Sequence, residues 1–515
     1  LLWTNNIMID QHNSLAEKFL KKGFWLYLFS FIIAPMGYII KIIISGELTV
    51  SEVGILYGII SLITMISAYN DLGMSESINH FVPKFVTEKR YDKVKTILVY
   101  AFIAQMITGI TIAAWFFFWA DWLAINYFKS EDAIETLKIF AFYFLGINIM
   151  QILSMFYISI QNTFAQKIID FVRMIWVLSI VLYMFFWNMW SLIHYSYAWI
   201  GWLYLWILVS LTLFYYRYLK KYLHSEKILW DKILFKEIFK YWALVFIWAQ
   251  AWVLLSQVDM QMIIVLLGTQ DAGYYTNYLS IVSIPFMIIG PIFGLLLPLF
   301  SEMYSKWETS KISLVKELFV NNFVIISIAF NLFLFTFAIP ISYVLFWEKF
   351  LTSWMILQYS ILFLTFNFLL QINFNILAGV WRVSERVKII TLAVIINFFT
   401  NLLFINLIWV AWAALATWLW WVIIWIMSEY VIKWEYTINI NWKNILKNIL
   451  ILWILSIVTL YYFWNFTDFI SQLSRDIWFW ILFTIWIVYF CIFIGINYGT
   501  FKNFILQIKK LKKWS

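Results

Sequence analysis

Long apolar runs separated by short polar turns make up most of this 515-residue chain. A run of about 20 apolar residues crosses a bilayer as a helix, so the pattern predicts membrane-spanning helices. We expect fourteen spans, with a kink at Pro340 in the ninth and only Asn406 separating the eleventh from the twelfth. The spans are Phe24–Ile44, Val53–Asn70, Thr96–Ala120, Ile139–Ile160, Ile168–Trp187, Ile193–Tyr215, Trp242–Leu267, Tyr278–Phe300, Phe319–Phe346, Met355–Val380, Ile389–Ile408, Val410–Ile432, Ile445–Trp464 and Ile477–Ile496.

The basic residues gather in alternate loops of this arrangement. With the N-terminus inside, all but five of the 36 lysines and arginines fall on the inner side. The five exceptions are Lys41, Lys129, Lys138, Lys349 and Arg475. Omitting one span would invert every later loop, so the bias supports the count and predicts that both termini are cytoplasmic. The chain begins with Leu, and Met8 is a candidate start.

Composition excludes a soluble domain, because 64% of residues are hydrophobic and only 12% are charged, against roughly 25% charged in soluble chains. The single cysteine, Cys491, excludes a disulfide framework and a multi-thiolate metal site. The net charge of +9 arises in the short loops and sets membrane orientation, so we expect no nucleic-acid partner. No phosphate-binding G-x-x-x-x-G-K-[ST] motif is present, which predicts no bound cofactor and secondary transport.

Two segments of the chain repeat one another. Leu48–Tyr57 reads LTVSEVGILY and Leu267–Thr276 reads LGTQDAGYYT, and each places an acid two residues before a glycine, Gly54 or Gly273. The first six spans and the next six therefore look like two parallel repeats. We expect an all-α polytopic protein with two pseudo-symmetric six-helix bundles, residues 1–225 and 226–440. Residues 441–515 would add two membrane helices and a basic cytoplasmic tail.

The stretch Lys240–Lys311 joins two spans through the short turn GTQDAG, with basic residues at both outer ends. It contains S-x-x-D-x-x-x-I, G-T-x-x-A-G-x-Y, I-P and P-x-F-S-E in that order. This pattern resembles the middle of polysaccharide flippases of the multidrug/oligosaccharidyl-lipid/polysaccharide exporter superfamily. The segment DLGMSESINHFVPKF at Asp71–Phe85 resembles the loop that follows span two in that family. The resemblance extends from about Lys18 to Ile432.

The resemblance implies a flippase, not an enzyme, that moves a polyprenyl-diphosphate-linked oligosaccharide across the cytoplasmic membrane of a bacterium by alternating access. Its partners would be that carrier and membrane lipids. A proton or sodium coupling ion and contacts with polysaccharide polymerase machinery are left open. Two alternatives remain: a drug/cation antiporter of the same superfamily, and a membrane-embedded glycan-processing enzyme. Acids within the first bundle would favour the antiporter, and a large outer loop would favour the enzyme.

Ionisable residues inside spans are the first candidates for function, because each is costly in lipid. Asp259 would face the cavity and bind a cation or proton, or else form a structural hydrogen bond. Lys41 and Arg173 would bind the diphosphate, or else extend to the interface. Arg173 could also pair with the nearby Asp170. No metal site is expected.

Two further sets of residues are candidates for function. Polar side chains in the second bundle would hydrogen-bond sugars or neighbouring helices; these are Asn277, Asn373, Asn375, Asn397 and Asn401. Asp71, Gly73 and Pro83 match the family's loop and would form a cytoplasmic gate.

The chain holds 33 Trp and only 16 Gly, where average usage predicts roughly 36 Gly. Interfacial belts account for Trp at span ends, such as Trp119 and Trp122. They do not account for others, which include Trp242, Trp248, Trp252, Trp409, Trp412, Trp418 and Trp420. Several tryptophans stand where the family pattern has glycine, namely Trp307 in YSKWE, Trp347 in LFWEKF, and Trp412 and Trp418 in VAWAALATW, and Trp242 corresponds to Gly23 in the internal repeat. We therefore predict that many of these positions are glycine in the living protein, from a gene that reads UGA as glycine.

Overall fold

The computed structural model describes residues 32–512 except 72, 161–162, 230–231, 233–234, 237, 239–250 and 466–473. Within these residues all regular structure is helical, as the hydrophobic pattern predicted. Lys240, Trp242 and Trp248, named above, lie outside the described residues.

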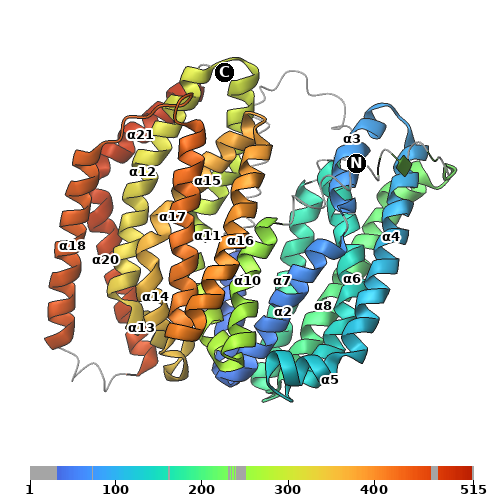
Figure 1. Cartoon of the computed structure of the whole chain (residues 1–515), viewed down its shortest axis with the longest axis horizontal. Helices are drawn as coiled ribbons and strands as arrows, with labels where there is room; N and C mark the ends of the chain where they lie inside the picture. The colour runs from blue at the N-terminus through green and yellow to red at the C-terminus, as the bar shows by residue number, and fades with distance from the viewer. Residues whose placement is uncertain are drawn as a thin grey trace.

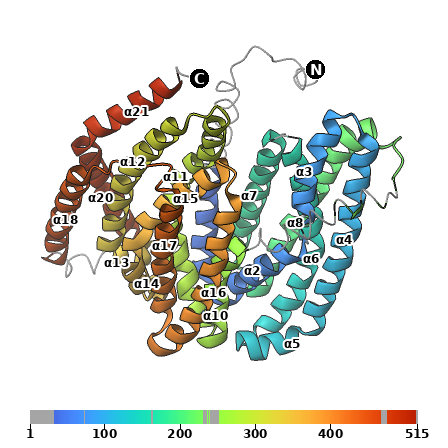
Figure 2. The same ribbon diagram turned by 45° about the horizontal axis from the view of Figure 1, so that its top comes forward.

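The first bundle starts with a helix over residues 32–47. Its further helices are α2 (Val50–Asn70), α3 (Met74–Thr87), α4 (Tyr91–Phe118), α5 (Ala120–Trp122), η1 (Leu123–Phe128), α6 (Ala133–Ser159), α7 (Thr163–Phe186), α8 (Leu192–Phe214) and η2 (Tyr215–Leu223). In Figures 1 and 2 the helices from α2 to η2 make up the blue-to-green half of the molecule, and helix 32–47 lies beside α11.

The second bundle and the C-terminal helices form the other half. They are α10 (Ala251–Leu266), α11 (Thr269–Ser305), α12 (Thr309–Thr336), α13 (Ala338–Phe346), η3 (Glu348–Phe350), α14 (Ser353–Ser360), η4 (Ile361–Phe363), α15 (Leu364–Gly379), α16 (Val383–Ile408), α17 (Val410–Ile432), α18 (Trp442–Asn465), α20 (Arg475–Ile496) and α21 (Tyr498–Lys512). Figure 1 shows α18 and α20 at the outer edge, beyond α12.

Ten described helices are long and apolar enough to cross a membrane, and α11, bent by 44° after Gly290, is an eleventh. Helix 32–47, α7 and α10 stand at the other three expected positions, and each borders undescribed residues. The predicted kink near Pro340 is a break at Phe337, between α12 and α13. The predicted break at Asn406 was wrong, since α16 continues to Ile408 and the chain turns at Trp409.

The two bundles meet through the turns at 46–49, 267–268 and 347–352, which we call the joined end. Figures 1 and 2 show α2 and α10 coming together there, at the lower end of both views. Ser51 Oγ lies 2.7 Å from Thr269 Oγ1 across the contact. Lys349 Nζ donates to the carbonyls of Gly46 and Leu48, at 2.8 and 2.7 Å. Polar bonds therefore hold the bundles together at this end.

Two glycines let α2 and α11 approach closely at the joined end. A Cβ added to Gly54 would lie 1.8 Å from the carbonyl oxygen of Thr269, and one added to Gly273 would lie 2.1 Å from that of Val50. In the sequence repeat Gly54 corresponds to Gly273, and Val50 to Thr269. The contact is therefore reciprocal, as expected if the two segments are related by an axis that passes between them.

Four tryptophans adopt the left-handed backbone region, where bulky residues are outliers. Their φ values are 61° at Trp307, 63° at Trp347, 64° at Trp381 and 87° at Trp409. Trp307 and Trp381 are also 84% and 79% exposed, so little packing holds their rings. Trp381 was not singled out from the sequence.

Candidate functional site

A cavity of about 410 Å³ lies between helix 32–47, α2, α7, α8 and α11, and so borders both bundles. Its lining residues are Ala34, Gly37, Tyr38, Ile40, Lys41, Tyr57, Arg173, Met174, Val177, Trp199, Trp202, Ser280, Ser283 and Met287. This described lining combines two cations with aromatic rings and hydroxyls, and it includes no carboxylate or histidine.

Lys41 is 5% exposed in the wall of this cavity. Its Nζ donates to Thr276 Oγ1 at 3.1 Å and lies 3.1 Å from the centroid of the Tyr57 ring. Both partners are neutral, and within the described residues no carboxylate comes within ion-pair distance of Lys41. Burying an ammonium among neutral groups is costly. The arrangement therefore favours a bound anion.

Arg173 reaches the same cavity from α7. Its guanidinium lies 4.7 Å from the centroid of the Trp202 ring, a cation–π contact that holds the side chain in place. The structure thus brings Lys41 and Arg173 together, although they come from opposite halves of the first bundle. Their predicted role in binding stays a prediction.

Asp259 lies in a separate site inside the second bundle, where it is 4% exposed. Its Oδ2 accepts hydrogen bonds from Tyr275 Oη at 3.0 Å and Thr417 Oγ1 at 2.5 Å. Its Oδ1 accepts one from Asn401 Nδ2 at 2.6 Å. These donors are all neutral, and among the described residues no Lys or Arg pairs with Asp259. A buried carboxylate held only by neutral donors suits a proton or a small cation.

The predicted sugar-binding amides are spread over several places. Asn397 belongs to the Asp259 site, where its Nδ2 donates to Thr417 Oγ1 at 2.9 Å. Asn277 accepts from Ser45 Oγ at 3.2 Å and so links the two bundles one turn from Lys41. Asn375 Nδ2 donates to a carbonyl of its own helix. None of the three lines the Lys41 cavity.

A buried ion pair in the second bundle was missed from the sequence. Lys316, which is fully buried, donates to Glu429 Oε1 at 2.6 Å. Asn373 Nδ2 donates to Glu429 Oε2 and to Ser428 Oγ, both at 3.0 Å. The predicted binding residue Asn373 therefore supports an ion pair between α12 and α17. The sequence signal that could have revealed this ion pair was Glu429, an acid inside the apolar span Val410–Ile432.

The segment predicted as a loop after span two is largely helical, which corrects that expectation. Residues 74–87 form α3, and Pro83 lies inside it. The chain leaves the helical path only around Asp71 and Gly73, and Gly73 has a φ of 73°. The predicted gating role of Asp71, Gly73 and Pro83 stays a prediction.

In fold, the chain is similar to solved structures of membrane transporters. It aligns with the lipid II flippase MurJ in an inward closed conformation at a TM-score of 0.63 and 16% identity, over 92% of this chain and 99% of that one. An inward-facing multidrug resistance MATE family transporter aligns at 0.62 and 13%, over 80% of this chain and 98% of that one. At such low sequence identities, the similarity shows a shared fold and nothing more specific.

The sequence gives the family directly. Residues 19–304, more than half of the chain, match the family described as polysaccharide biosynthesis protein, and the chain belongs to that family. This confirms the family predicted from the motifs in Lys240–Lys311. An uncharacterized membrane protein of Methanocaldococcus jannaschii is 24% identical over 429 residues, covering 81% of this chain and 84% of the relative.

Proposed function

We propose that this protein is a flippase that carries a lipid-linked oligosaccharide with a diphosphate group across the cytoplasmic membrane by alternating access. The observation that supports this most directly is the pair of cations, Lys41 and Arg173, in one largely apolar cavity between the bundles. A diphosphate carries negative charges that two cations neutralise through strong charge-assisted hydrogen bonds. The hydroxyls of Ser280 and Ser283 would face the first sugar.

The same cavity argues against the two alternative functions. A positively charged lining repels a cationic drug, which is what a drug/cation antiporter of this fold would bind. A glycan-processing enzyme would need carboxylates or a histidine at the substrate, and the described lining residues include none. Transport of an anionic lipid carrier therefore fits the cavity better than either alternative.

The conformation fits one step of the proposed cycle. With the basic loops in the cytoplasm, the joined end faces outward, and the bonds from Ser51 and Lys349 close that side. The cavity around Lys41 would then receive substrate from the cytoplasmic leaflet. A carrier whose lipid tail stays in the bilayer would enter with its headgroup first.

Lys41→Gln is expected to weaken binding of a polyprenyl diphosphate roughly 10- to 100-fold, because a charge-assisted hydrogen bond contributes about 1.5–3 kcal/mol. Binding of uncharged polyprenol should stay unchanged. Purified protein in nanodiscs, titrated with each lipid, measures both affinities. The exposed Lys388→Gln is the matched control, since it removes one positive charge far from the cavity. Equal affinity for the diphosphate in Lys41→Gln and the parent would contradict the proposal.

Asp259→Asn tests whether this flippase is coupled to an ion. The amide keeps the size of the side chain but removes the charge that a proton or sodium ion would neutralise. We expect normal insertion and expression, with transport into proteoliposomes reduced about 10-fold or more. If Asp259 only packs the bundle, Asp259→Asn should transport like the parent and Asp259→Leu should lower expression. The Lys41 experiment is unaffected by either outcome.

A further inference from the structure

The break between α2 and α3 lies deep inside the first bundle. Gln105, which contacts the break, stands near the middle of α4 (Tyr91–Phe118). At 1.5 Å per residue it is about 20 Å from either end of that helix. Interrupted helices at mid-membrane depth are where transporters of several folds bind ions, because the ends of the half-helices present unpaired polar groups. The break is therefore a candidate ion site.

Asp71, at the break, is 5% exposed and accepts hydrogen bonds from neighbouring groups of two helices. Ser75 donates its backbone N–H to Oδ2 at 3.1 Å and its hydroxyl to Oδ1 at 2.6 Å. The Nε2 of Gln105 also donates to Oδ1. These bonds fix the carboxylate between the C-terminal end of α2, where the helix dipole favours a positive charge, and the first turn of α3, where it favours a negative one.

Two side-chain amides beside Asp71 have their polarity fixed by partners that can only accept. Gln105 turns Nε2 to the Asp71 carboxylate. Asn148 turns Nδ2 to the backbone carbonyl of Gln105, which leaves its Oδ1 to accept from Asn70 Nδ2 at 2.6 Å. The amide nitrogens of Gln105 and Asn70 therefore point to Asp71 and Asn148, respectively. The oxygens of the same two amides, Gln105 Oε1 and Asn70 Oδ1, point elsewhere.

These two amide oxygens are buried and accept no hydrogen bond from the described residues, and neither does Ser67 Oγ, one turn before Asp71. Gln105 is 0% exposed, Asn70 3% and Ser67 4%. Leaving a buried acceptor unsatisfied costs about 1–3 kcal/mol, so three at one place require an explanation. Asn331 also has an unsatisfied amide oxygen, but the bonds of its amide nitrogen go to a carbonyl and a hydroxyl, not to an acid.

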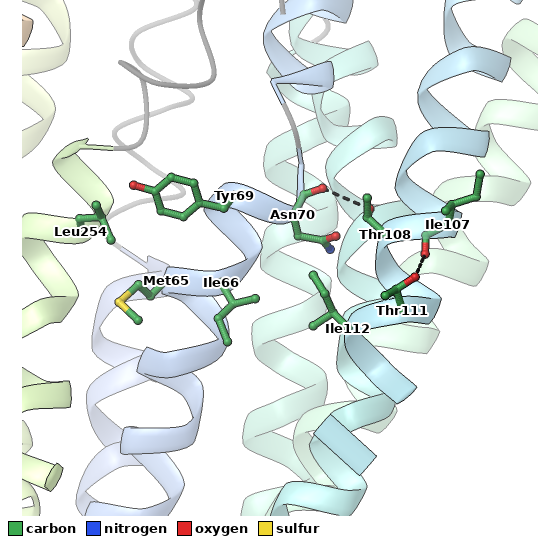
Figure 3. A pocket seen from close by; sticks show the side chains of 9 residues that line it. All are labelled: Met65, Ile66, Tyr69, Asn70, Ile107, Thr108, Thr111, Ile112 and Leu254. Carbon is green, nitrogen blue, oxygen red and sulfur yellow. Dashed lines mark hydrogen bonds between the residues drawn. The ribbon is translucent and has the colours of Figure 1, made fainter. Parts of the chain in front are cut away.

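We propose that Asp71, Asn70 and Gln105 bind a monovalent cation of sodium size, with Ser67 as a further oxygen donor. One carboxylate and neutral oxygens supply a single negative charge and the hard ligands that such an ion prefers. Asn70 also lines a second cavity of about 410 Å³, between α2, α4 and Leu254 of α10. Figure 3 shows Asn70 facing α4 at this cavity, with its backbone carbonyl accepting a hydrogen bond from Thr108. Of the proposed ligands, Asn70 is the one that borders this cavity in the described structure.

The site is separate from Asp259, which lies in the second bundle, and does not depend on the transported substrate. Binding of radioactive ²²Na⁺ to the full chain in nanodiscs tests it. We expect Asp259→Asn to retain specific ²²Na⁺ binding and the double variant Asp71→Asn, Asp259→Asn to lose it to background. Asn331→Leu in the Asp259→Asn protein is the matched control, because it removes a buried amide without a neighbouring acid; it should bind like Asp259→Asn alone.

A second measurement avoids any variant at the site. In the Asp259→Asn protein, replacing choline chloride by NaCl at constant ionic strength should raise the Tm further with each tenfold increase in Na⁺. No ²²Na⁺ binding in Asp259→Asn, or full binding in the double variant, would overturn the proposal. So would displacement of the bound ²²Na⁺ by micromolar Ca²⁺, which would indicate a divalent site. Whether Asp259→Asn loses transport or keeps it bears only on the proposal that transport is coupled to an ion at Asp259.

Discussion

Peptides from the native protein are expected to contain glycine at positions 307, 347, 381 and 409. Positions 307 and 381 follow α11 and α15 and occupy the place where a Schellman motif has its left-handed glycine. At the first, Glu308 N donates to Met303 O and Trp307 N to Tyr304 O, at 3.0 Å each. At the second, Arg382 N donates to Leu377 O at 2.8 Å and Trp381 N to Ala378 O at 3.4 Å. Glycine is the usual residue here because it lacks a Cβ.

Positions 347 and 409 make tight turns between consecutive helices. Trp347 has φ 63° and ψ 170°, and Trp409 has φ 87° and ψ 177°. That region is essentially restricted to glycine. Gly268 makes the equivalent turn before α11 with φ 112° and ψ −175°. A tryptophan held there costs roughly 1–3 kcal/mol, so four such residues in one chain are hard to reconcile with a stable protein.

Mass spectrometry of native peptides, together with the codons of the gene, decides the matter. UGA should encode positions 307, 347, 381 and 409. Trp119 and Trp122 stand at a span end with ordinary negative φ values, −101° and −64°, so they serve as controls and should remain Trp. A recombinant chain with glycine at the four positions should also have a higher Tm than one with Trp. Trp in the native peptides at these positions would reject the recoding, and interfacial belts would then have to explain the excess.

Local signals in the sequence were sufficient to predict the helices and to identify single candidate residues for function. Apolar runs located the helices, and one cation or acid in such a run marked Lys41, Arg173 and Asp259, because charge in lipid is informative by itself. Their partners were not predictable, because helix packing decides which of many similar faces meet. Asn397 illustrates this: its amide suits a sugar, yet the fold places it beside Thr417 in the Asp259 site.

The break at Asp71 was interpreted as a loop for a related physical reason. Asp and Gly in sequence indicate a turn, and the following residues are polar enough for a cytoplasmic segment. The structure shows a second helix, α3, that begins directly after the break, and the carboxylate of Asp71 bonds its first turn through Ser75. Nothing in the local pattern distinguishes a turn at the membrane surface from a break inside a bundle, since both need the same residues.

Gly54→Ala is expected to prevent closure of the joined end and to abolish most transport. Its Cβ would lie 1.8 Å from the carbonyl oxygen of Thr269, well inside the roughly 3.5 Å at which non-bonded carbon atoms come into contact. The obstacle is backbone, so side-chain rearrangement cannot relieve it. Overpacking of this kind typically costs 1–3 kcal/mol, enough to reverse a conformational equilibrium of a few kcal/mol.

Gly273→Ala should have the same effect from the other bundle, because its Cβ would lie 2.1 Å from the carbonyl oxygen of Val50. Gly294→Ala is the matched control: it lies on α11 too, but an added Cβ there meets nothing within 4 Å.

Cross-linking of Ser51→Cys with Thr269→Cys reports closure, since these hydroxyls lie 2.7 Å apart; the native Cys491 is first replaced by serine. Both glycine variants should lose most of the cross-link and of transport, because each 1.4 kcal/mol of overpacking lowers the ratio of closed to open molecules about tenfold, while Gly294→Ala keeps both. Cross-linking at the parental level in Gly54→Ala and Gly273→Ala would show that the bundles can close without this contact. The reciprocal glycine pair would then be a packing detail of α2 and α11, not a requirement of the transport cycle.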